Sequence, residues 1–98
     1  MGNSIKSAQF LIESRLRDAA RGDCAALYDL GVCYSTGTAG VDIDLIEAHK
    51  WFNLAAVSGS KVAQISRAEI AEDMTAREIA TAQAAARAWL AMTQRRAA

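Results

Sequence analysis

Hydrophobic residues recur three and four positions apart in five segments of the chain, and short polar or glycine-containing stretches separate these segments. This spacing places the apolar side chains of each segment on one face of an α-helix. It predicts helices over about residues 5–21, 24–34, 45–57, 61–73 and 76–95. The fold class that follows is all-α with about five helices, arranged as antiparallel helix pairs stacked on one another.

The residues expected in the core are those that make up these apolar faces. From the first helix to the fifth they are Phe10, Ile12, Leu16 and Ala19 or Ala20; Leu27, Leu30, Gly31 and Tyr34; Ala48, Trp51, Phe52, Ala55 and Ala56; Val62, Ile65, Ala68 or Glu69, and Ile70 or Met74; and Ile79, Ala82, Ala86, Trp89, Leu90 and Thr93. Gly31 lies inside its helix, where glycine is about 1 kcal/mol less favourable than alanine. We therefore expect something bulky from a neighbouring helix to approach the backbone there.

Residues that favour helix ends stand at the predicted boundaries. Asp23 and Asp44 directly precede the second and third helices, where a carboxylate can accept a hydrogen bond from a free backbone N–H of the first turn. Thr75 and Glu78 have the spacing of a capping box, and Glu47 lies at the same spacing from Asp44. These pairs predict sharp starts for the third and fifth helices.

Glycines mark the predicted helix ends. Gly22 ends the first helix, and the polar, glycine-rich stretch from Ser35 to Ile43, which contains Gly37 and Gly40, breaks the second. The third helix stops at Ser58 and Gly59. The connections are therefore short turns.

Composition and charge narrow the class of protein. The chain has 98 residues, no proline and 52% hydrophobic residues, which predicts a single helical domain over 1–98. Its net charge is zero, with +2 over residues 1–22, −4 over 23–60 and +2 over 61–98, so nucleic-acid binding is not expected. No apolar run approaches the roughly 20 residues that a bilayer requires, and no targeting segment is recognisable, so membrane insertion is not expected.

The two cysteines and the single histidine do not have the spacing of a disulfide, a metal site or a catalytic site. Cys24 and Cys33 lie nine positions apart in one predicted helix, on opposite faces and roughly 13 Å apart, so they cannot form a disulfide. Two unbridged thiols suit the reducing cytoplasm. His49 lies one position off the face that carries Trp51, with no nucleophile or carboxylate pair to support it. We therefore expect no catalytic site, metal or cofactor.

The loop before the third helix has two alternative interpretations. Asp42 and Asp44 could suggest a cation loop, but the further oxygen ligands of such a loop are missing and helix capping is favoured. Gly37 and Gly40 could suggest a phosphate-binding loop, but no Lys-Ser or Lys-Thr follows them and no strand precedes them. Both features indicate turn geometry.

The order of small and aromatic residues between Ala26 and Ala63 resembles the Sel1-like repeat, a relative of the tetratricopeptide repeat. The matching positions are Ala26, Leu30, Gly31, Tyr34, Gly37, Gly40, Val41, Asp44, Ala48, Trp51, Phe52, Ala55, Ala56, Gly59 and Ala63. They span about 38 of the 98 residues, with Ala39 as an extra residue between the two turn glycines. Residues 67–89 also look like the helical tail of short bacterial members. The resemblance implies a short right-handed α-solenoid, with an N-terminal helix at 5–22, the repeat at 23–60 and capping helices at 61–98.

The same resemblance implies that the chain binds other proteins and has no enzymatic activity of its own. By analogy with related repeats, the binding groove would lie on the inner face of the second helix, with Tyr28, Val32 and Ser35 inside it and Asp29 at its edge. The first helix could instead cover this groove. An alternative function is a self-associating homodimeric structural or regulatory subunit. About one and a half repeats fall short of the three usually needed, and dimerisation through the first or fifth helix would bury more surface.

Overall fold

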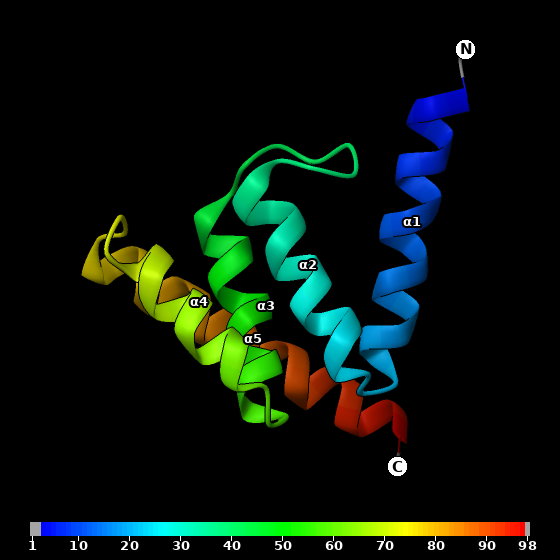
Figure 1. The fold of residues 1–98 in the computed structure, drawn as a ribbon. Helices are drawn as coiled ribbons and strands as arrows, with labels where there is room; N and C mark the ends of the chain where they lie inside the picture. The colour runs from blue at the N-terminus through cyan, green and yellow to red at the C-terminus, as the bar shows by residue number, and fades with distance from the viewer. Residues whose placement is uncertain (1–2, 98) are drawn as a thin grey trace.

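The computed structural model describes the backbone of residues 3–97 and the side chains of residues 8–94. Its five helices are α1 (Asn3–Ala20), α2 (Cys24–Thr36), α3 (Leu45–Val57), α4 (Lys61–Ala71) and α5 (Ala76–Ala97), joined by short connections except for the longer loop over residues 37–44 between α2 and α3 (Figure 1). No strand occurs between residues 3 and 97. The predicted all-helical fold is therefore confirmed.

Most of the predicted caps are present. Asp23 accepts a hydrogen bond from the backbone N–H of Ala26, and Asp44 accepts from those of Ile46 and Glu47. At the start of α5 the capping box is reciprocal, because the Thr75 hydroxyl and the Glu78 carboxylate each accept from the other residue's backbone N–H. These bonds satisfy donors that the first turn of a helix leaves free.

The capping box expected between Asp44 and Glu47 is wrong. The Glu47 carboxylate accepts a hydrogen bond from Nε1 of Trp51 and pairs with Lys50, while the backbone N–H of Asp44 donates to the carbonyl of Tyr34. Glu47 therefore binds side chains one turn further along its own helix rather than the backbone at its start.

Two helix ends also differ from the prediction. The break expected from Ser35 onward begins at Gly37, which has a φ of 72° that favours glycine, because the hydroxyls of Ser35 and Thr36 donate to the carbonyl of Val32 without leaving the helix. Helix α4 ends at Ala71 rather than at Asp73.

Helix α3 occupies the centre of the molecule. It contacts α2, α4 and α5, whereas α1 packs on α2 at the edge (Figure 1). Seven of its 13 residues are buried, including all five that the sequence predicts. The molecule is 22 Å thick, which is about two helix diameters. The right-handed solenoid stays a prediction.

Two aromatic contacts hold the helices around α3. A Cβ at Gly31 would lie less than 3.0 Å from three atoms of the Phe52 ring, so the predicted close approach at Gly31 is confirmed. Next to Phe52 along α3, Trp51 meets Trp89 of α5 edge-on, with ring centroids 4.8 Å apart. Such an arrangement aligns the positive edge of one ring with the negative face of the other.

The cores of the two edge helices were predicted less well. Phe10 on α1 is 66% exposed, and Val62 and Ile65 on α4 are 51% and 59% exposed. The fully buried residues described in these two helices are small: Ala19, which the sequence predicts as an alternative to Ala20, and Ala63. Each edge helix packs mainly on one neighbour, and an alanine at the contact lets the two helix axes come close.

Candidate functional site

The structure places the four predicted groove residues on one side of α2. Tyr28, Val32 and Ser35 follow one another at helical spacing, with Asp29 beside them, and all four are half-buried. The fully buried residues of α2 are Ala26, Leu27, Leu30, Gly31 and Cys33, of which Gly31 borders this surface and contacts the same Phe52 ring as Tyr28. The four side chains therefore form one continuous surface, which we call the α2 face.

Two of these side chains also contribute to the fold. The ring of Tyr28 packs against that of Phe52, with centroids 5.5 Å apart and a tilt of 45°. Val32 packs against the edge of the hydrophobic core. The apolar part of the α2 face, Tyr28 and Val32, thus packs against the hydrophobic core, whereas Asp29 and Ser35 give the face its polar groups.

Helix α1 borders the α2 face at Asp29. The carboxylate of Asp29 accepts from Nε of Arg15 at 3.1 Å, and the two side chains are 47% and 35% exposed. An ion pair with this much exposure is screened by water and contributes little to stability. Asp29 therefore keeps a partly accessible negative charge beside Tyr28 and Val32.

A polar pocket of about 220 Å³ adjoins Asp29 in the angle between α1 and α2. The residues that line it are Arg15, Asp18, Asp23, Ala25, Ala26 and Asp29. Three carboxylates against one guanidinium make the pocket acidic, which favours a cationic group. The described residues contain no cluster of three or more His, Cys, Asp or Glu side chains that could hold a metal ion.

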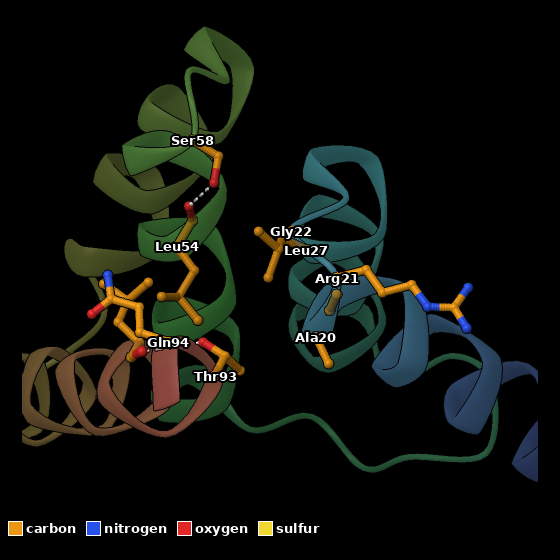
Figure 2. Close-up of a pocket in the computed structure, with 10 residues that line it drawn as sticks. Ala20, Arg21, Gly22, Leu27, Leu54, Ser58, Thr93 and Gln94 are labelled. Carbon is orange, nitrogen blue, oxygen red and sulfur yellow. Dashed lines mark hydrogen bonds between the residues drawn. The ribbon is translucent and has the colours of Figure 1, made fainter. Parts of the chain in front are cut away.

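A second pocket, of about 210 Å³, lies where the ends of four helices meet (Figure 2). Its lining is Ala19, Ala20, Arg21, Gly22, Leu27, Leu54, Ser58, Leu90, Thr93 and Gln94. In Figure 2, Leu27 and Leu54 stand on opposite walls and the Arg21 side chain points away from the pocket. The hydroxyls of Ser58 and Thr93 donate to carbonyls of their own helices. The space therefore suits an apolar group.

His49 is more buried than the sequence predicts. It is 3% exposed, and its Nδ1 has no hydrogen-bond partner among the side chains and backbone that the structure describes. Burial lowers the pKa of His49 below its usual value, and the positive charge of Arg67 lowers that pKa further. The Arg67 guanidinium itself donates to Asn53 Oδ1, so α4 contributes a cation to this side of α3. The spacing of three residues between His49 and Phe52 is the signal that could have placed it on a buried face.

The two cysteines and Tyr34 carry further reactive groups in or beside the core. Cys24 and Cys33 are free thiols, as predicted. Burial raises the pKa of the Tyr34 hydroxyl, and the nearby carboxylates of Glu47 and Asp44 raise it further, so Tyr34 stays un-ionised near neutral pH. None of the described helices combines the length and apolarity needed to cross a membrane.

Comparisons of the chain with models of protein families, with curated proteins and with solved structures found no match. The resemblance to the Sel1-like repeat therefore stays a prediction drawn from the motif itself.

Proposed function

We propose that this chain is a non-enzymatic interaction module that binds a segment of another protein on the α2 face. The observation that carries the proposal is the presence of Tyr28 and Val32, two half-buried side chains, on one side of α2 beside the acidic pocket. A Sel1-like repeat would use the same helix. Tyrosine suits such a role because it offers a large contact area at a small cost in conformational entropy.

The chemistry of the surface defines the class of partner. Tyr28 and Val32 offer apolar contacts, and the pocket next to them holds the carboxylates of Asp18, Asp23 and Asp29. We therefore propose a partner segment that places a basic side chain beside an apolar one. The net charge of −4 over residues 23–60 would attract such a segment before contact.

The two unpaired thiols also bear on where this binding takes place. Cys24 and Cys33 are free, and free thiols persist in a reducing compartment. We accordingly propose that the module acts in the cytoplasm.

Selection of binders from a library of random peptides displayed on phage tests the proposal. We expect selected peptides to share a basic residue next to an apolar one, and to bind Tyr28→Ala more than about tenfold less tightly, since truncating a hot-spot residue costs about 2 kcal/mol or more. Affinity would be measured by isothermal titration calorimetry.

Matched variants separate binding from folding. Tyr28→Phe keeps the ring that packs on Phe52 and should keep most of the affinity. Arg87→Ala, an exposed position on α5, should change nothing. Circular dichroism would confirm that each variant is helical. If a folded Tyr28→Ala protein binds the peptides as tightly as the wild type does, the α2 face is not the binding surface.

A further inference from the structure

A stripe of exposed residues runs along the side of α1 that faces solvent. Phe10, Glu13, Arg17 and Ala20 are spaced three, four and three positions apart, so they lie on one side of the helix. All four are exposed, and Phe10 is 66% exposed although it is a large apolar side chain. We call these four residues the α1 stripe.

The contacts that α1 makes with the rest of the molecule use other residues. Ile12 and Leu16 pack against the core, and Ala19 is buried in it. Arg15 pairs with Asp29 of α2. Neither Glu13 nor Arg17 forms an ion pair with another side chain that the structure describes. Phe10, Glu13 and Arg17 therefore have no role in the contacts described within one chain, and Ala20 only lines the apolar pocket.

The order of residues in the stripe is self-complementary. When two identical helices pack antiparallel about a two-fold axis, positions equally far from the axis on either side lie opposite each other. About an axis at residue 15, Glu13 lies opposite Arg17 of the other copy, and Phe10 lies opposite Ala20. A single register therefore brings the opposite charges of Glu13 and Arg17 together and also brings the apolar residues Phe10 and Ala20 together. Because of the two-fold symmetry, each of these contacts occurs twice.

The apolar pocket at the helix ends offers a place for the aromatic ring in this register. Ala20 is one of the residues that line the pocket, together with Leu27, Leu54 and Leu90 (Figure 2). Its volume of about 210 Å³ is ample for a phenyl ring, since apolar cavities of about 150 Å³ accommodate benzene. Phe10 of a second copy, opposite Ala20, would be placed to enter this pocket.

We infer that a second copy of this chain binds the α1 stripe, forming a two-fold symmetric dimer with antiparallel α1 helices. Phe10 of each copy enters the apolar pocket of the other, and Glu13 of each pairs with Arg17 of the other. The charges on α1 are complementary to those of an identical, antiparallel helix. This favours a second copy as the partner, because binding of an unrelated protein would not require the charges on α1 to match each other. The inference is independent of the proposed function, because the α1 stripe and the α2 face share no residue.

The mass of the wild-type chain in solution is the first test. We expect light scattering coupled to size-exclusion chromatography to give a dimer in the micromolar concentration range. Replacing Phe10 by Ser should weaken the dimer more than about tenfold, as for a buried aromatic anchor. Ile65→Ser removes an apolar side chain of similar exposure, 59%, from α4 and should leave the dimer intact.

Charge reversal tests the register itself. Glu13→Arg and Arg17→Glu each bring like charges together across the interface, and each should weaken the dimer about tenfold. The double variant Glu13→Arg/Arg17→Glu restores opposite charges and should dimerise again. Mixing the two single variants should also restore a dimer, because each then supplies the charge that the other lacks. Circular dichroism would show that every variant stays helical.

The outcomes separate cleanly. A wild-type monomer throughout the micromolar range overturns the inference, as does a dimer that survives both Phe10→Ser and the single charge reversals. Two single variants that stay monomeric when mixed overturn the proposed register. None of these results depends on Tyr28, so the peptide-binding proposal is tested independently by the Tyr28 variants.

Discussion

Gly31 illustrates how a single residue decides the packing of two helices. The Phe52 ring of α3 occupies the space that a side chain at position 31 would fill. Glycine inside a helix costs about 1 kcal/mol relative to alanine, so the close contact with a buried ring has to outweigh that cost. Phe52 is itself 2% exposed and cannot turn toward solvent.

Replacing Gly31 by Ala should therefore destabilise the protein, although alanine is the better helix former. We expect a loss of about 1 to 3 kcal/mol, because the added methyl group overlaps the Phe52 ring. Urea denaturation followed by circular dichroism measures the free energy of unfolding.

A double-mutant cycle identifies the cause of that loss. Phe52→Ala removes all three ring atoms that lie nearest Gly31, so Gly31→Ala should cost less in that background than in the wild type. A Gly31→Ala protein more stable than the wild type would mean that the ring moves aside at little cost.

At the scale of the helices, local chemistry sets most of the boundaries. Asp23, Asp44, Ser60 and Thr75 each accept a hydrogen bond from the first turn of the helix that they precede. Such caps depend only on residues three or fewer positions apart, which is why the sequence predicts those at Asp23, Asp44 and Thr75, although the cap at Ser60 was not predicted. The capping box predicted for Glu47 is wrong because, in the folded protein, the Glu47 carboxylate accepts a hydrogen bond from Trp51, one turn away.

The cap of the central helix should be measurable in the stability of the whole protein. Asp44 accepts from two backbone N–H groups at the start of α3, so Asp44→Ala should cost about 1 kcal/mol, within the usual range of about 0.5 to 2 kcal/mol. Chemical denaturation gives the value. Asp42→Ala removes an exposed carboxylate from the same loop and serves as the control. Equal losses in both variants would point to a general charge effect rather than to the cap.

At the scale of the molecule, the burial of one histidine links stability to pH. His49 is the only histidine of the chain, and burial holds its pKa below 6.5 in the folded state. The unfolded chain exposes it, so between the two pKa values the unfolded state binds more protons. Stability is therefore retained above about pH 6.5 and decreases as the pH falls toward the folded pKa.

Unfolding free energies measured between about pH 7.5 and 5.5 should show this decrease, because carboxylates titrate mostly below that window. His49→Leu should flatten the profile. It should also cost little at neutral pH, since Nδ1 of His49 has no hydrogen-bond partner to lose. If the variant keeps the wild-type slope, another group causes the pH dependence.

The candidate site was predictable only in part. The periodicity of α2, together with the motif, predicts that Tyr28, Val32 and Ser35 share one side of that helix, and they do. Neither pocket could be predicted. Each depends on where the end of α1 lies relative to α2, and the apolar pocket also needs α5, whose Leu90 is far from Leu27 in the sequence.

The sequence by itself determined the five helices, most of their caps and most of the buried residues of α2, α3 and α5, because helical periodicity and capping act between residues a few positions apart. Only the tertiary structure decided that Phe10, Val62 and Ile65 stay exposed while His49 is buried. The physical reason is that burial depends on which helices lie side by side. An edge helix with one main neighbour buries an alanine and leaves larger apolar side chains in solvent, whereas the central helix is covered from three sides.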